Sequence, residues 1–293
     1  MVTEQQTLDL AAVDGYRWME NGQSALSGKA LRLFKRLDLL FLNWAAEFQS
    51  SQYHFPTFIP ADELVRLDYF ANFPHLVTMP VTLESSDENL ERFAQGSTLD
   101  DAGNLNLTEL APVRDVFTPA ACYHFYIDMQ SSSLAQAKYV TTRATCIRKE
   151  ERYLPLQRQW SFSMREMVCV GSAEEVTDFL AEARQRITRF FKDSGLPIKW
   201  MDATDPFFKP ARNPKYLMQK LDPVKTEMVF GDSLAIGSVN FHRNYFGEAF
   251  QILRNGEDAY SGCLAFGLER WMYASLAYFG LDEALWPLPE LKE

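Results

Sequence analysis

The 293-residue sequence has no apolar run long enough to cross a membrane, since a spanning helix needs about 20 mostly apolar residues. The most apolar stretch, residues 37–48 (LDLLFLNWAAEF), contains two acidic residues. The first ten residues, MVTEQQTLDL, are polar and acidic, unlike a secretory signal. We therefore expect no membrane partner and a cytoplasmic location.

Cysteine is scarce, and an excess of positive charge is absent. The four cysteines are Cys122, Cys146, Cys169 and Cys263. So few, so widely spaced in a chain of this length, do not form a disulfide framework, which indicates a reduced, intracellular protein. The formal net charge is -10, whereas nonspecific nucleic-acid binders are usually basic because phosphate contacts supply their affinity. The locally basic residues 182–193 and 209–220 are more typical of a solvated helix face and a loop.

Apolar residues, by contrast, are plentiful. Hydrophobic residues make up 47% of the chain and aromatic residues 14%, which is enough for one large domain with its own core. Helical and strand-like segments alternate irregularly, which favours the α+β class. We therefore expect a single domain over residues 1–293. The acidic residues 84–115 are expected to form a surface excursion, and the proline-rich residues 197–223 an irregular insertion.

Local patterns predict the main elements. Apolar spacing predicts helices over residues 25–50, 61–74 and 172–195, the last with Ser172 as its cap and Gly195 at its end. β-branched and aromatic residues predict strands over 138–153 and 160–171, joined by a loop. Shorter strands are expected over residues 53–60, 226–231, 234–242 and 248–253, and a strand followed by a helix from Gly262 onward.

The segment CIRKE (146–150) places an arginine and a glutamate two residues apart in the first of these long strands. Alternate strand residues share a face, so Arg148 can grip a phosphate while Glu150 accepts a hydrogen bond from an exocyclic amine. By itself, such a pair is more typical of a surface salt bridge.

Two further segments add to this pattern. The return strand carries Arg158, Phe162 and Glu166 on one face, where Phe162 can present a flat ring to a base; the alternative is an ordinary half-buried strand. At the junction of the last strand and helix, an arginine is costly to bury without an anion or a stacking partner. Arg270 can stack on the other side of the same base, unless it forms a structural pair with Glu269.

Together, these three segments resemble the second and third motifs of class II aminoacyl-tRNA synthetases, and residues 30–60 resemble the first. The seryl-tRNA synthetase type is most similar, because TCIRKE, the R-x-x-x-F-x-x-x-E pattern of Arg158, Phe162 and Glu166, and GLER occur in its order. The resemblance implies one catalytic domain with an antiparallel sheet flanked by helices.

The same resemblance implies an ATP site. Arg148 would hold the α-phosphate, Glu150 would accept from the adenine amine, and Phe162 and Arg270 would enclose the adenine ring, with Arg158 at the entrance. A Mg²⁺ ion would assist, with Glu227 and Ser238 as its candidate ligands. The family usually has an acidic residue three positions before that serine, where this chain has Ala235.

The cysteines point to one particular type of seryl-tRNA synthetase. The atypical, archaeal-type seryl-tRNA synthetases hold zinc with a Cys-Glu-Cys set, which corresponds here to Cys122, Glu166 and Cys263. Buried inert cysteine is the usual alternative. His124 and His242 are substitute ligands with less support. Cys146 and Cys169 have no counterpart in the set and are expected in the core.

Few residues precede the first motif or follow the third, so we expect neither the segments with which a seryl-tRNA synthetase grips tRNA nor tRNA as a partner. This combination resembles the amino acid:carrier protein ligases. The resemblance implies a homodimer joined through residues 30–60. It also implies activation of a small amino acid, glycine or alanine, as its adenylate, followed by transfer to the phosphopantetheine thiol of a carrier protein. Residues 173–193 and 197–220 are candidate docking segments for that protein.

Two alternatives stay open at this point. The same adenylation chemistry can serve tRNA or a small amine as the acceptor. The second alternative is a catalytically silent paralogue that binds amino acid or nucleotide as a regulator. The presence of Arg148, Glu150, Phe162 and Arg270 argues against this, and Ala235 argues mildly for it.

Overall fold

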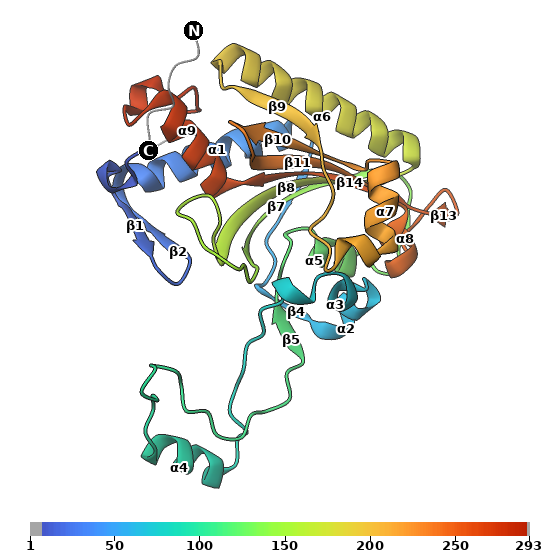
Figure 1. Ribbon diagram of the computed structural model, residues 1–293. Coiled ribbons are helices and arrows are strands. Elements are labelled where there is room, and N and C mark those ends of the chain that lie inside the picture. Colours follow the sequence, from blue (N-terminus) through green and yellow to red (C-terminus); the bar gives the residue numbers. More distant parts are fainter. Residues whose placement is uncertain (1–7, 292–293) are drawn as a thin grey trace.

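The computed structural model describes residues 8–291, and a seven-stranded sheet runs through their centre (Figure 1). All neighbouring strands are antiparallel except the edge pair β3 and β7. In spatial order, the strands are β3 (Ser51–Tyr53), β7 (Lys138–Ile147), β8 (Ser161–Gly171), β14 (Tyr260–Gly267), β11 (Leu234–Arg243), β10 (Lys225–Phe230) and β9 (Ile198–Asp202). The antiparallel sheet predicted from the motifs is thus confirmed.

Helices flank this sheet. The helices are α1 (Gly28–Ala46), α2 (Ala61–Arg66), α3 (Tyr69–Asn72), α4 (Asp87–Gln95), α5 (Tyr123–Asp128), α6 (Ala173–Ser194), α7 (Pro214–Leu221), α8 (Tyr245–Phe250) and α9 (Leu268–Phe279), with 3-10 turns at Leu10–Ala12, Pro74–Leu76, Pro210–Arg212 and Glu283–Leu285. Of these, α4 lies far from the sheet (Figure 1). Small sheets join β1 (Tyr16–Met19) with β2 (Gln23–Leu26), β4 (Phe58–Pro60) with β5 (Asp115–Phe117), and β6 (Ser133–Leu134) with β12 (Leu253–Arg254) and β13 (Glu257–Asp258).

Alternation along the central strands creates two cores. Met167 and Leu264 pack with Trp271 in the core that α1, α6 and α9 close. Their strand neighbours Val168 and Cys263 belong to the second core, closed by α2, α5 and α8. Consecutive strand residues point to opposite faces, so α6 covers one face of the sheet while α5 and α8 lie on the other.

Several local predictions are confirmed. Helix α6 has the predicted limits, with a capping box between Ser172 and Glu175 and Gly195 in the left-handed conformation at its end. Strand β8 and the succession of β14 and α9 also lie where the sequence placed them. These elements are set by neighbouring residues, which explains why the sequence reveals them.

Other local predictions are wrong. The helix expected over residues 61–74 is divided into α2 and α3, because Asp68 adopts a positive φ of 50°. The strand expected over 248–253 begins as helix α8, in which Gly247 lies so close to the Ala259 backbone that a Cβ would clash. The insertion at 197–223 is not irregular throughout, since it contains β9 and α7.

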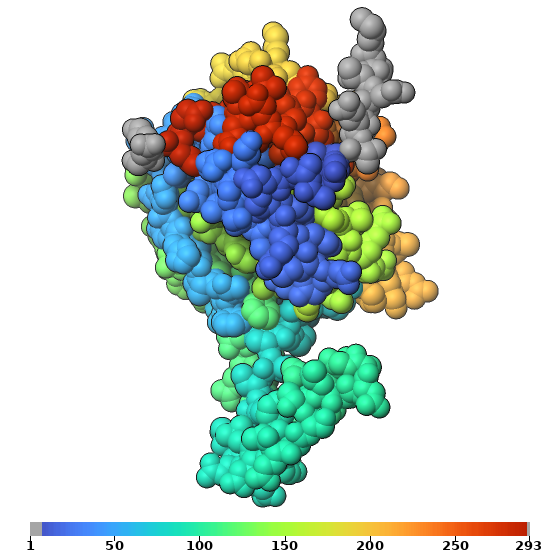
Figure 2. Space-filling model, turned by 90° about the vertical axis from the view of Figure 1, so that its left-hand side faces the viewer, coloured from blue at the N-terminus to red at the C-terminus, as the bar shows by residue number. Residues whose placement is uncertain are grey.

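Residues 84–115 include an arm that stands away from the body (Figures 1 and 2). Its two stalks are joined by the buried side chain of Asn89, which donates to the carbonyl oxygens of Glu84 and Glu109 at 2.8 and 2.9 Å and accepts from the Glu109 N–H at 3.0 Å. The expected surface excursion is therefore an ordered arm.

Within residues 8–291, no helix combines the length and apolar character needed to span a bilayer.

Candidate functional site

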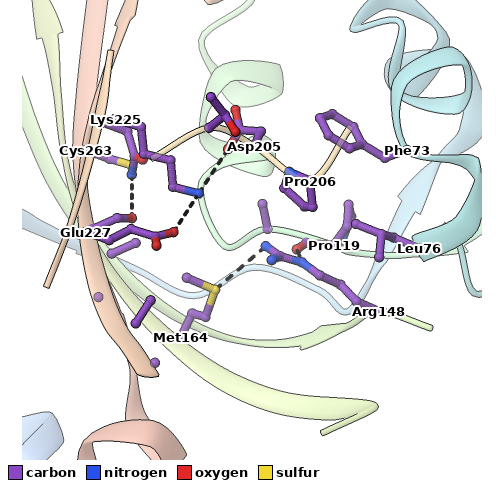
Figure 3. A pocket seen from close by; sticks show the side chains of 18 of the residues that line it. Phe73, Leu76, Pro119, Arg148, Met164, Asp205, Pro206, Lys225, Glu227 and Cys263 are labelled. Atoms are coloured by element: carbon purple, nitrogen blue, oxygen red, sulfur yellow. Dashed lines mark hydrogen bonds and ion pairs between the residues drawn. The ribbon is translucent and has the colours of Figure 1, made fainter. Parts of the chain in front are cut away.

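A cavity of about 1530 Å³ opens on the sheet face that carries α5 and α8 (Figure 3). Its floor includes Phe162, Met164 and Glu166 of β8, together with Cys263 and Ala265 of β14. These residues alternate along their strands, so the pleat of the sheet turns them all to one side. The cavity is thus built on the central strands.

Arginines gather at one end of this cavity, where Arg148, Arg158 and Arg270 all line the wall. Arg270 donates from Nε to the Gln157 carbonyl oxygen at 2.7 Å and from Nη1 to the Ala235 carbonyl oxygen at 2.9 Å. Burial lowers the pKa of Arg270, and the charges of Arg148 and Arg158 lower it further. An anion bound among these three cations would be strongly favoured.

Arg148 lies directly after β7 and reaches into the same cavity. Its Nε donates to the Pro119 carbonyl oxygen at 2.6 Å, and its guanidinium lies 5.3 Å from the centre of the Phe162 ring (Figure 3). Phe162 and Arg270, far apart in sequence, both line this cavity. Their enclosure of an adenine ring stays a prediction.

The first predicted strand ends earlier than expected, at Ile147. The Lys149 N–H bonds to the Leu76 carbonyl oxygen at 3.0 Å, so the chain leaves the sheet there. Arg148 and Glu150 are thus not alternate residues of one strand, and the reasoning from strand periodicity is wrong. Glu150 still lines the cavity, where its carboxylate accepts from Arg158 at 2.8 Å.

The candidate magnesium residues Glu227 and Ser238 are direct cross-strand partners on β10 and β11 and line the cavity. Lys225 was not predicted from the sequence; its Nζ lies 3.1 Å from Asp205 and 3.3 Å from Glu227 (Figure 3). Burial by itself lowers the pKa of Lys225, but the two carboxylates raise it above its usual value. Glu227 therefore already has a cationic partner.

The three predicted zinc ligands meet beside these residues. Atoms of Cys122, Glu166 and Cys263 that can bind a metal all lie within 4.8 Å of one another, and all three residues are buried. They come from different elements, since Cys122 precedes α5 while Glu166 and Cys263 lie on the adjacent strands β8 and β14.

The chemistry of this group fits a zinc ion. Glu166 Oε1 accepts from the Ala121 N–H at 3.3 Å, but the buried Oε2 has no partner among the described residues. Burial raises the pKa of Glu166 to about 8. A hydrogen bond between the two cysteines lowers the pKa of Cys263 and raises that of Cys122. Two sulfurs and a carboxylate with an unused oxygen form a donor set that zinc prefers, and zinc would offset the cost of burying them.

The other cysteines and the histidines lie outside this group. Cys146 and Cys169 are buried, as expected, and burial raises the pKa of each thiol to about 12. His124 stacks on Phe55. His242 lies 3.6 Å from the Cys263 sulfur through Nε2, yet it is not a member of the three-residue group.

Helix α7 lies beside the cavity, and its position was not predicted. Lys215, Met218 and Gln219 line the wall, and Gln219 makes two hydrogen bonds of 3.0 Å with Asp205. No residue of α7 is fully buried, and the exposed fractions of Leu217, Met218 and Leu221 are 48%, 57% and 82%. Helix α6, the other candidate docking segment, covers the opposite face of the sheet.

Sequence comparison finds relatives but no matching family model. The chain is 32% identical over 241 residues to amino acid–acyl-carrier-protein ligase 1 of Bradyrhizobium diazoefficiens, covering 80% of this chain and 73% of the relative. It is equally identical to ligase 2 of that organism over 243 residues, covering 80% and 71%. A type-2 serine–tRNA ligase of Methanopyrus kandleri is 23% identical over 263 residues, which are 81% of this chain and 50% of the relative.

Solved structures are similar over nearly the whole chain. The M. kandleri seryl-tRNA synthetase, solved with an A. aeolicus tRNASec, gives a TM-score of 0.75 at 20% identity and covers 94% of this chain and 57% of its own. The Giardia lamblia prolyl-tRNA synthetase with prolyl-adenylate gives 0.66 at 14% identity, covering 91% and 51%. The chain thus spans little more than half the length of these synthetases, and its fold is the class II synthetase fold that the motifs predicted.

Proposed function

The chain belongs to the amino acid–acyl-carrier-protein ligase family, and from this we propose that it activates a small amino acid and transfers it to a carrier protein. Glycine or alanine is the expected substrate, and the phosphopantetheine thiol is the expected acceptor. One observation supports this most: an arginine cluster and a Cys-Glu-Cys group share a single cavity.

The arginine end of the cavity suits ATP. In the first step, a carboxylate oxygen of the amino acid attacks the α-phosphorus, the bond to the β-phosphate bridging oxygen breaks, and pyrophosphate leaves. Arg148 and Arg270 would stabilise the charge that develops on the phosphate. Phe162 and Arg270 would enclose the adenine, Glu150 would accept from its amine, and Arg158 would hold Glu150 in place.

Glu227 and Ser238 are our candidates for contact with the Mg²⁺ of Mg–ATP. The ion would compete with Lys225 for the Glu227 carboxylate, since Lys225 Nζ lies 3.3 Å from Oε1. Asp205 would then remain as the partner of Lys225, so the protein need not leave that half-buried cation unpaired.

Cys122, Glu166 and Cys263 would hold zinc. The ion, when bound with an open position, supplies a Lewis-acidic site for the amine of the substrate. The protein residues would position the substrate. The sulfurs and carboxylate fix the site on the sheet, and the nearby arginines attract the nucleotide, so the amine and the carboxylate of the substrate are held at the two ends of a short span.

In the second step, the thiolate attacks the carbonyl carbon of the adenylate, the bond from that carbon to the phosphate oxygen breaks, and AMP leaves. Helix α7 is our candidate dock for the carrier protein. It borders the cavity and exposes three apolar side chains and Lys220, while Lys209 and Arg212 are exposed in the turn just before it. Carrier proteins are acidic, so this charge is complementary.

We also propose a homodimer joined through residues 30–60. These residues include β3, the last strand at one edge of the sheet, and β4. The exposed edge offers unpaired backbone groups to a partner strand. Sedimentation at several protein concentrations tests this assembly.

The central experiment measures exchange of labelled pyrophosphate into ATP with each amino acid in turn, alongside the zinc content. A second assay offers the labelled amino acid to a carrier protein with and without its phosphopantetheine, to tRNA, and to free amines. Exchange with glycine or alanine and label on the modified carrier alone are the expected results. Absence of exchange with every amino acid would favour a silent regulator, and label on tRNA or an amine would identify the other acceptor class.

A further inference from the structure

Two side chains of β11 hold the sulfur of Cys263. Asn240 Nδ2 lies 3.3 Å from this sulfur, and His242 Nε2 lies 3.6 Å from it. Asn240 and His242 both lie on β11 and line the cavity, and it is their contacts with Cys263 that place the two side chains on its side of the sheet. No comparable N–H contact reaches the Cys122 sulfur from residues 8–291. The two sulfurs of the group are therefore held differently.

The second nitrogen of His242 is held equally firmly. Nδ1 lies 3.1 Å from the Ser261 hydroxyl and 3.2 Å from the Tyr126 hydroxyl. Ser261 and Tyr126 are fully buried, so water does not compete for these contacts. Tyr126 is fixed in turn by stacking on Phe246, with ring centres 3.9 Å apart and planes 4° from parallel. The imidazole ring is thus anchored from behind while its other edge faces Cys263.

This placement keeps the ring out of the metal group. Ligands of one tetrahedral zinc ion lie within roughly 4 Å of one another, since zinc–ligand bonds are about 2.0–2.3 Å long. The ligand atoms of Cys122, Glu166 and Cys263 lie within 4.8 Å of one another. His242 contacts the Cys263 sulfur, but its nitrogens are not within this distance of all three ligand atoms.

We propose that His242 is a positioning residue that donates its Nε2–H to the Cys263 thiolate and stays outside the coordination of the metal. A thiolate can only accept a hydrogen bond, so the proton lies on Nε2, and Nδ1 accepts from the hydroxyl of Ser261 or Tyr126. The histidine thereby fixes one sulfur and leaves the fourth position free for the substrate amine. This inference rests on the zinc role in the proposed function.

Hydrogen bonds to a metal-bound ligand orient it and tune its basicity, and their loss typically costs 10- to 100-fold in metal affinity. Removal of the donor from His242 should therefore weaken zinc binding about that much. It should also change the spectrum of the thiolate–metal bond. A residue that only fills space would change neither.

The test compares His242→Leu, which removes the donor, with His242→Gln, whose amide can supply an N–H at similar reach. Zinc affinity is measured by competition with a chelator, and the sulfur–metal charge-transfer band is measured on the cobalt-substituted protein. We expect roughly 10- to 100-fold weaker binding and a shifted band for the leucine variant, with the glutamine variant within a few-fold of wild type.

Wild-type affinity and an unshifted band in the leucine variant would overturn the proposal. So would loss of an imidazole signal from the zinc X-ray absorption spectrum of that variant, since His242 would then be a ligand. If the leucine variant does not fold, Tyr126→Phe keeps the stack on Phe246 but loosens the ring, and we expect weaker zinc binding there too. Normal metal binding without amino-acid-dependent exchange would reject the proposed function and leave the role of His242 standing.

Discussion

Replacement of Arg270 by methionine should separate function from stability. The side chain makes two hydrogen bonds to backbone carbonyl oxygens, of Gln157 and Ala235. Bonds of this kind to a charged group contribute about 1.5–3 kcal/mol each. Against this, burial lowers the pKa of the half-buried Arg270, the charges of Arg148 and Arg158 lower it further, and taking a cation out of water in this way costs up to several kcal/mol.

These opposing contributions are similar in size, so we expect the free energy of unfolding to change by only about 2 kcal/mol or less. The effect of the replacement on the reaction rate is not offset in this way. Loss of one preorganised group that stabilises developing charge costs about 2.7–4 kcal/mol, which is a 100- to 1000-fold fall in rate. Amino-acid-dependent pyrophosphate exchange and urea unfolding on the same preparation measure the two quantities.

Asp38→Ala provides the matched control on the opposite face of the sheet. Asp38 accepts from Nε and Nη2 of the buried Arg165 at 2.8 and 3.0 Å. Its removal leaves that arginine unpaired, and we expect a loss of about 3–5 kcal/mol of stability with exchange per folded molecule retained. The reasoning is refuted if Arg270→Met destabilises the fold as much as Asp38→Ala while exchange per folded molecule stays within tenfold of wild type.

Three more predictions address the metal group, the pH dependence and the dock. Cys122→Ala should lose zinc and exchange together, whereas Cys146→Ala, outside the cavity, should keep both; full exchange by metal-free Cys122→Ala would contradict the zinc role. Burial raises the pKa of Glu269 to about 7, so the folded state holds this proton more tightly than the unfolded state, and stability falls as pH rises from about 4.5 to 7. Wild type should lose about 3 kcal/mol over this window relative to Glu269→Gln, measured by urea unfolding at each pH, and parallel curves would disprove the assignment. Lys220→Glu should raise the KM for the carrier protein and leave exchange unchanged; an unchanged KM would move the dock away from α7.

Elements that depend on interactions between neighbouring residues could be predicted from the sequence. The capping box of Ser172 and Glu175 defines the start of α6, and Gly195 its end. Alternation and β-branched residues revealed β8. The order of the motifs identified the family and, through it, Arg148, Phe162 and Arg270 as residues of one cavity. These signals are contained within a few residues of chain, or in a motif order that resembles a known family.

Features that depend on contacts between distant segments became visible only in the folded chain. The cysteine–glutamate group exists because β14 pairs with β8 and α5 approaches the same face, which no spacing in the sequence expresses. The ion pair of Lys225 with Asp205 and the anchoring of His242 by Ser261 and Tyr126 arise in the same way. The break in the expected 61–74 helix also lies at such contacts, since Tyr245 donates to the Leu67 carbonyl oxygen at 2.6 Å and Lys215 lies 3.0 Å from Asp68, the residue with the positive φ. Local propensity is a weak free-energy term, and packing between remote segments overrides it.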